Sequence, residues 1–480
     1  MASLNDILSI GRSGVLTHQE RLAVISHNIA NVDTKGYHRQ KAVLGTNPPN
    51  EPNLYATRNY SLGTGVKITD VIRLRDNLRE QSLLAQTGEL GEHELLAESL
   101  SDVETLMNGL GDASLSSRFQ DFWAAWQDLA NNADQLAYRS TLIENSVALT
   151  EQFNTLAGRL ADYRTAIADG AGPTLSGSAV SEVTEINDLA TRIQDLNKRI
   201  TILSSQGFGA NDLQDRRDLL VRELSGKANV TVSSEYEIRI DGQLLVSGDG
   251  NTRNDLSISN ATSTPIELML DGAVVNVNSG RLGALVETAA IVDNMSDNLD
   301  TLANELISQV NTIHQAGFDL DGNPGVEFFT GTGAAGIMVN PLIHNEANPS
   351  LDNPRLIAAA QTVHDPGPPV VANVRDGANA LAIADLCRAL VPGLGSQTFD
   401  GYFSNMLTGL GAQIQAETDL AADSQAIVDM LEGAIQSATG VNLDEELVEM
   451  INAQRAYQAS ARVITTADSM MDVVINRMGA

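Results

Sequence analysis

Apolar residues recur at every seventh position near both ends of this 480-residue chain. The C-terminal repeat consists of Leu443, Met450, Tyr457, Ile464, Met471 and Met478. The N-terminal repeat consists of Leu8, Val15, Leu22 and Ile29. A seven-residue repeat keeps one apolar seam facing a constant direction along a helix, so each end needs a partner helix beside it. We therefore predict that the two ends form an α-helical coiled coil with each other and that copies of the chain assemble through it.

The C-terminal repeat also predicts where its helix begins. Asn442 stands three residues before Glu445, which is the spacing of a helix cap, and the acidic residues after Leu443 favour the positive end of the helix dipole. A second row of the seam holds Leu447, Ala461 and Ile475, interrupted by Gln454 and Asp468. Polar residues in a seam lower its stability but fix its register, as an assembly joint requires. Amphipathic helices also pack into the core of their own domain, which is the alternative interpretation of these repeats.

The long stretch between the ends predicts a mainly α protein with inserted β structure. Helical spacing runs through 95–106, 136–168, 186–200, 213–224, 282–314 and 378–437, the last of these interrupted at Pro392 and Gly393. A further helix is expected from about Asp70. Both tryptophans cluster with phenylalanines, which predicts a buried aromatic anchor for a central helical bundle. This cluster consists of Phe119, Phe122, Trp123 and Trp126. Short alternating runs between 229 and 280, separated by Asp241-Gly242 and Asp271-Gly272, predict a small antiparallel β domain.

These patterns predict three domains, because a chain of this length divides into several cores. The first is a terminal coiled-coil assembly domain that combines 1–60 with 440–480. The second is a central helical-bundle domain that combines 61–228 with 281–439. The third is an inserted β domain, 229–280, whose hairpins we expect to fold apart from the bundle.

The charge and the cysteine content exclude several classes of protein. A net charge of -31 repels nucleic acid and anionic membrane surfaces, so neither is expected as a partner. No run is apolar enough to span a bilayer, and the N-terminus lacks the pattern of a cleaved secretory signal. With Cys387 as its one cysteine, the chain forms no intrachain disulfide. If the protein leaves the cell, we expect export without a cleaved signal peptide.

No catalytic, cofactor-binding or metal-binding residues are predicted. The run Gly331–Gly336 matches the G-x-G-x-x-G pattern, but a strand-like segment follows it where a dinucleotide site needs a helix, so we interpret it as a turn. The run Asp319–Asn323 resembles the start of a calcium loop, but Pro324 and Thr330 stand where that loop needs glycine and glutamate. A cluster of acidic residues is interpreted as a solvated helix face: Asp212, Asp215 and Asp218.

Two segments resemble a known protein family. The run His27–Tyr37, which reads HNIANVDTKGY, resembles the N-terminal signature of bacterial flagellar rod, hook and hook-associated proteins. The runs 440–446 and 454–464 are similar to the C-terminal region of the hook-associated members. Lys35 and His38 replace the residues that are usual in this signature. Through this resemblance Asn31, Gly36 and Tyr37 join the predicted assembly interface.

The resemblance implies a structural protein of the flagellum, and not an enzyme, that forms a ring at the junction between hook and filament. Its implied partners are further copies of itself, the hook protein, the second hook-filament junction protein and a cytoplasmic export chaperone that holds the C-terminal helix. It also implies an extracellular location after type III export. The alternatives are another axial component, such as a hook or distal rod protein, and, less favoured, an enzyme that acts on the cell wall.

Overall fold

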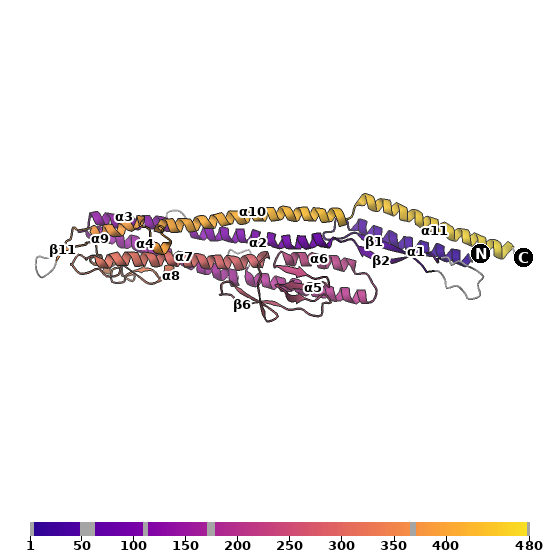
Figure 1. Ribbon diagram of the computed structural model, residues 1–480, viewed down its shortest axis with the longest axis horizontal. Helices are drawn as coiled ribbons and strands as arrows, with labels where there is room; N and C mark the ends of the chain where they lie inside the picture. The colour runs from indigo at the N-terminus through magenta and orange to yellow at the C-terminus, as the bar shows by residue number, and fades with distance from the viewer. Residues whose placement is uncertain (1–3, 49–62, 109–113, 170–177, 365–370, 478–480) are drawn as a thin grey trace. The chain divides into compact units, whose positions relative to one another are not determined.

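A computed structural model describes residues 4–48, 63–108, 114–169, 178–364 and 371–477 of the chain. The molecule is mainly helical with small antiparallel sheets, which confirms the predicted fold class (Figure 1). Two compact units are present. Unit 1 combines residues 1–88, 186–255 and 423–480, and unit 2 combines residues 89–185 and 256–422.

Unit 1 is built from both chain ends and a middle segment. Its helices are α1 (Leu4–Ala30), the start of α2 (Asn77–Asn108), most of α5 (Ala179–Ser205), α6 (Asn211–Ser225), the end of α10 (Phe399–Thr439) and α11 (Leu443–Arg477). Its strands are the pair β1 (Gln40–Thr46) and β2 (Val66–Arg73) and the sheet β3 (Val230–Val232), β4 (Ile238–Ile240) and β5 (Gln243–Val246).

The helix predicted from about Asp70 is wrong, because β2 continues to Arg73 and α2 begins at Asn77. Strand β2 pairs antiparallel with β1, from Gln40 opposite Arg73 to Thr46 opposite Val66. Apolar residues of this segment are spaced by two or four residues, which fits the two-residue period of a strand: Val66, Ile68 and Ile72. The apparent helical spacing from Val71 onward arises because the last residues of strand β2 are followed closely by the first turn of α2.

Unit 2 holds the aromatic core that the sequence predicts. Its helices are α3 (Leu115–Asn131), α4 (Leu136–Asp169), α7 (Gly280–Ala316), α8 (Gly333–Gly336) and α9 (Ala378–Ala384), with the remainder of α2, α5 and α10. Phe119, Phe122 and Trp126 are fully buried, and Trp123 is 8% exposed. Their rings contact Phe153, Phe328, Phe329 and Phe399. The prediction of a buried aromatic anchor is therefore confirmed.

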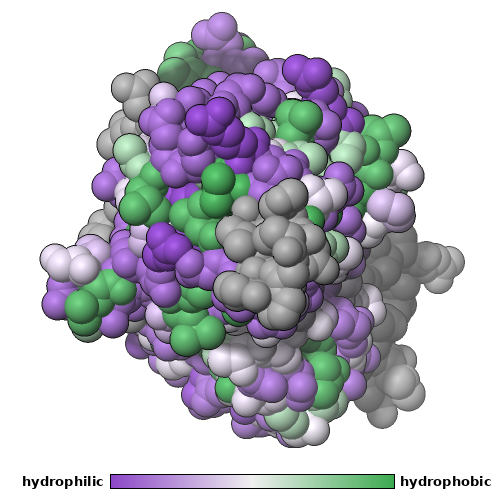
Figure 2. Space-filling model, turned by 90° about the vertical axis from the view of Figure 1, so that its left-hand side faces the viewer, coloured by the Kyte–Doolittle hydropathy of each residue, from purple (hydrophilic) through white to green (hydrophobic). Residues whose placement is uncertain are grey.

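Short strands and single helical turns complete unit 2. The strands are β6 (Leu256–Asn260), β7 (Glu267–Leu270), β8 (Ala273–Val275), β9 (Phe329–Thr330), β10 (Met338–Val339), β11 (Val363–His364) and β12 (Val371–Ala372). The 3-10 turns are Pro349–Leu351, Pro354–Leu356, Asp385–Arg388 and Pro392–Leu394. On the face that carries β11 and α9, hydrophobic side chains lie in small groups among hydrophilic ones, as on an ordinary water-facing surface (Figure 2).

Residues 229–280 form two separate three-stranded sheets. Sheet β3-β4-β5 belongs to unit 1, whereas sheet β6-β7-β8 belongs to unit 2. Asp241 and Asp271 have positive φ, and each precedes a glycine in the turn between two strands, where the sequence predicts hairpins. The compact units thus divide the chain at different places from the three predicted domains.

Sheet β3-β4-β5 is held against α5 by backbone contacts. The Asn197 side chain donates to Ser247 O at 2.9 Å, and the Gln194 side chain donates to Gly250 O at 3.0 Å. A Cβ atom on Gly250 would lie 2.7 Å from both Gln194 O and Lys198 N. Glycine at this position therefore lets the loop after β5 approach the helix backbone.

We predict that Gly250→Ala destabilises the protein by about 2 kcal/mol more than Gly242→Ala, because only the first methyl group collides with backbone. Both glycines have positive φ, +74° and +76°, so the conformational cost is matched, and nothing lies within 4 Å of a Cβ on Gly242. Urea denaturation followed by circular dichroism measures the difference. Equal midpoints for the two variants would contradict the close approach.

Candidate assembly interface at the chain ends

The two terminal helices lie antiparallel and side by side (Figure 1). A Cβ on Gly11 of α1 would lie 2.8 Å from the Ile464 side chain of α11, whereas Asn28, near the other end of α1, bonds to Glu446 at the start of α11. The predicted pairing of the two ends is therefore present within one chain.

Small residues form the line along which the two helices meet. A Cβ on Gly14 would lie 2.5 Å from Ser460 Oγ, and Ala453 and Ala467 of α11 are buried. Ala453, Ser460 and Ala467 are themselves seven residues apart, so this row is a heptad of small residues beside the heptad of large ones. This row of small residues is present in the sequence, but a pattern based on large apolar residues does not reveal it.

The predicted interface residues lie beside this line of contact. Several are half-buried: Leu8, Val15, Leu22, Ile29, Asn31, Gly36, Tyr37, Met450, Ile464 and Met471. Leu443, Leu447 and Tyr457 are exposed. The side chain of Ile475 and the whole of Met478 lie outside the described residues. Pairing within one chain thus leaves much of both large apolar rows accessible, and their role in assembly stays a prediction.

Helix α11 also exposes apolar side chains that the predicted rows do not include. These include Val448, Ile451, Met470 and Val473, with exposed fractions from 44% to 58%. The close approach of α1 to α11 at Gly11 and Gly14 uses none of them. We call these four residues, together with Leu447, the outer face of α11.

A buried amide fixes the base of the helix pair. Asn28 is 1% exposed, and its Nδ2 donates to Gln40 O at 2.8 Å and to Glu446 Oε2 at 3.1 Å. Its Oδ1 accepts from Tyr37 O–H at 2.8 Å and from the Gln40 amide at 3.0 Å. Both donors and both lone pairs of the amide are therefore satisfied, and one side chain joins α1, β1 and α11.

Charged residues reinforce the same base. Arg39 Nε donates to Glu446 Oε1 at 2.6 Å, and Arg39 donates through a second nitrogen to Glu445 Oε2 at 2.7 Å. Arg21 pairs with Glu449 one turn further along α11. Because Glu446 is 2% exposed, its hydrogen bonds with Arg39 and Asn28 replace those that its side chain would make with water.

His38 connects this base to the rest of unit 1. Its Nδ1 lies 2.8 Å from Asp215 Oδ1 of α6, and its Nε2 lies 3.0 Å from Glu80 Oε1 of α2. Arg73, at the end of β2, bonds to both Asp215 and Asp218. Burial opposes the charge of His38, but the hydrogen bonds to the two carboxylates outweigh burial and raise the pKa of His38 to about 9.

The interpretation of the acidic cluster as a solvated face is wrong for two of its three members. Asp215 is buried against His38 and Arg73, and the Asp218 side chain, which is 12% exposed, pairs with Arg73. Asp212 alone is exposed, and it accepts from the Gln40 side chain at 2.8 Å. Their basic partners lie about 140 or more residues away in sequence, so local spacing gives no sign of the network.

The two glycine- and aspartate-rich motifs of unit 2 have polar groups with partners within the chain. The run Gly331–Gly336, interpreted as a turn, contains the one-turn helix α8, and the strand β10 follows it. The amides of Gly333 and Ala334 donate to Asn304 and Asp300 of α7, at 2.8 and 2.6 Å, where a phosphate loop would bind its ligand. Asp319 Oδ1 accepts from the amides of Asp321 and Asn323, at 2.8 Å each. Cys387 lies half-buried in a 3-10 turn.

The described part of the chain holds no group of three or more histidine, cysteine, aspartate or glutamate side chains able to bind a metal ion. None of its described helices is long and apolar enough to cross a membrane.

We predict that Gly11→Leu separates α1 from α11, because the larger side chain cannot fit against Ile464 and the backbone oxygen of Ser460. Hydrogen exchange on the purified chain should become faster in both helices. Gly433→Leu in α10 is the control, because nothing lies within 4 Å of a Cβ there. The control should leave exchange in the terminal pair unchanged and gain up to about 1 kcal/mol from helix propensity. Unchanged exchange in Gly11→Leu would contradict the close packing.

His38 should make the stability of unit 1 depend on pH. Because its folded pKa of about 9 lies above the ordinary value of 6.5, its stabilisation is complete below pH 6.5 and is lost as the pH rises through 9. We expect wild type to exceed His38→Gln by roughly 3 kcal/mol at pH 6 and by far less at pH 9.5. Urea denaturation across this range provides the test. A difference that stays constant with pH would mean that the imidazole is neutral in the folded protein.

Comparison with known proteins matches both ends and the middle of the chain. Residues 100–329 match the flagellar hook-associated protein FlgK helical domain. Residues 8–38 match the flagella basal body rod protein family, and residues 431–478 match the C-terminal region of the flagellar basal body rod FlgEFG proteins. Flagellar hook-associated protein 1 of Bacillus subtilis is 26% identical over 98% of both chains. Its Escherichia coli counterpart is 25% identical over 98% of this chain and 100% of its own length.

The fold is also similar to a solved structure, the flagellar hook junction protein FlgK from Burkholderia pseudomallei. That similarity has a TM-score of 0.60 at 17% identity and covers 75% of this chain and 100% of the other. The helical-domain match, the rod-protein matches at the two paired ends and the near full-length relatives agree with one another. The chain is similar to the FlgK hook-associated proteins along almost its whole length and has a structural role in the bacterial flagellum.

Proposed function

We propose that copies of this chain form the ring that joins the flagellar hook to the filament, and that the terminal helix pair makes the joint. The observation that supports this proposal is the outer face of α11. It remains exposed although α11 already has a helical partner and a polar anchor within its own chain. Exposed apolar surface on a helix of this length is typical of a face that a neighbouring molecule covers.

The proposed partners follow from this arrangement and from the family. They are neighbouring copies of the chain, the hook protein and the second hook-filament junction protein. Before export, a cytoplasmic chaperone would cover the exposed C-terminal helix. The chain would reach the outside of the cell through the flagellar export apparatus without a cleaved signal peptide, and it would act without catalysing a reaction.

Another axial component, a hook or distal rod protein, is the second candidate. The ends of the chain match rod-protein families, and the rod protein FlgG of Buchnera aphidicola is 35% identical over 14% of the chain. The hook-associated relatives, however, are similar along 98% of the chain, including the helical middle. This breadth favours the junction. Loss of the protein should therefore leave complete hooks that carry no filament.

The outer face of α11 provides a direct test. In cells, Leu447→Asp with Ile451→Asp should abolish filament attachment and release flagellin into the medium, because two charges would be desolvated in the joint. The purified variant should unfold at the wild-type midpoint, since both side chains are about half exposed in the single chain. Gln458→Asp is the control, because Gln458 is exposed and already polar.

Normal swimming of the double variant would contradict a joint made by this face. A large loss of stability in the purified variant would show instead that the two residues hold the single chain together. Release of cell-wall fragments by the purified protein would favour the enzyme alternative.

A further inference from the structure

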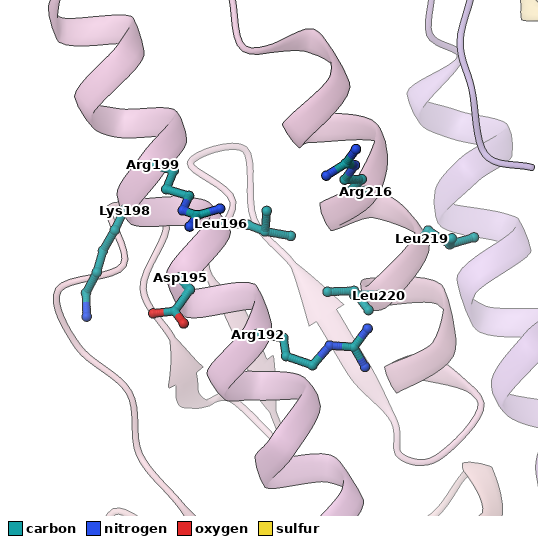
Figure 3. Close-up of a pocket in the computed structure, with 8 residues that line it drawn as sticks. All are labelled: Arg192, Asp195, Leu196, Lys198, Arg199, Arg216, Leu219 and Leu220. Carbon is teal, nitrogen blue, oxygen red and sulfur yellow. The ribbon is translucent and has the colours of Figure 1, made fainter. Parts of the chain in front are cut away.

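A basic groove lies between α5 and α6 in unit 1. Figure 3 shows Arg192, Arg199 and Arg216 reaching into the space between the two helices, where Leu196 and Leu220 also point. Lys198 and Asp195 point away from this space. The groove has a volume of about 650 Å³.

The three guanidinium groups lack partners among the residues that the structure describes. Arg192, Arg199 and Arg216 are exposed, and none of them forms a described hydrogen bond or ion pair. In contrast, Arg21, Arg39 and Arg73 in the same unit all pair with carboxylates. Three unpaired arginines in one groove of a chain with a net charge of -31 form a site for an acidic group.

Helix α10 presents an acidic and apolar face of matching size. Asp423, Ile427 and Met430 lie at positions i, i+4 and i+7, so they share one side of the helix. Ile427 and Met430 are 39% and 64% exposed, whereas Ser424 and Val428 on the other side are buried. Asp429 flanks this face and accepts from the Gln425 side chain.

The spacings of the two surfaces agree. Arg192 and Arg199 are seven residues apart on α5, or about 10 Å along the helix axis, with Leu196 between them. The face from Asp423 to Met430 has the same length. A second α10 lying in the groove would therefore bring Asp423 to one of the arginines and its apolar side chains to Leu196.

The two surfaces face away from each other within unit 1. Figure 1 shows α2 and α6 between α10 and α5. One copy therefore cannot bring its own α10 face into its own groove, whereas two neighbouring copies can. A contact between different surfaces of identical chains continues from copy to copy and closes into a ring or builds a helical array.

We propose that the α5–α6 groove of one copy binds the Asp423–Met430 face of α10 from a neighbouring copy. This proposal rests on the proposed function, in which copies of the chain lie beside one another. The contact also opposes the repulsion between chains that each carry a net charge of -31. It adds an interface outside the terminal helix pair.

Disulfide cross-linking in assembled flagella tests the contact. In a Cys387→Ser background, Leu196→Cys with Ile427→Cys should give covalent dimers and longer ladders on oxidation, and a reducing agent should remove them. Ile202→Cys with Ile427→Cys is the matched control, because Ile202 is exposed on α5 outside the groove. Attached filaments without a ladder would overturn the contact but leave the junction function intact. Absence of the protein from the hook-filament junction would overturn the junction function itself.

A charge exchange tests the pairing independently of packing. Arg199→Glu and Asp423→Arg, each added to the cross-linking pair, should lower the yield about tenfold, because each places like charges together. The two changes in one chain should restore the yield, since every copy carries both surfaces. A loss with Arg199→Glu but not with Asp423→Arg would mean that the groove binds a different acidic group. Failure of the combined variant to recover would also overturn the assignment.

Discussion

The close antiparallel packing of α1 on α11 is the contact on which the proposed joint depends. Helices separated by large side chains leave room for slippage, whereas Gly11 and Gly14 bring the two backbones together at Ser460. The amide of Asn28 then fixes the register, because its four hydrogen bonds are satisfied only when Tyr37, Gln40 and Glu446 are all in place. A glycine contact against Ser460 and Ile464 at one end and a polar anchor at the other hold the pair, while much of its large apolar rows stays accessible.

The sequence predicted the helical fold, the aromatic core and the pairing of the ends, because each depends on a local period that the chain repeats. It did not predict which row of α11 faces α1. The large residues at Leu443 and Leu447 dominate a hydrophobic pattern, but the closest approach to α1 is at Ser460, and the buried alanines of the same row, Ala453 and Ala467, carry little hydrophobic signal. A row of small residues is distinctive only once the partner helix and its glycines are known.

The buried charge network was beyond prediction for a different reason. His38, Glu80 and Asp215 come from three segments that share no motif, and each by itself has the sequence environment of a surface residue. Strand β2 was missed because it ends immediately before a helix and its last residues fit both periods. The division of residues 229–280 between two units depends on which helix each sheet packs against, and hairpin signals contain no such information.

The contact of α11 with α1 stabilises the single chain, whereas the outer face of α11 is left for assembly. Gly11, Gly14 and the Asn28 anchor bring α1 against Ser460, Ile464 and Glu446, so the outer face of α11 contributes little to folding and remains available for neighbours. If the residues of the outer face also held α11 against α1, a neighbouring molecule could bind them only by displacing α1. Charge is divided in a similar way in unit 1. Arginines near the helix pair are neutralised within the chain, whereas those of the α5–α6 groove are left for an acidic surface outside it.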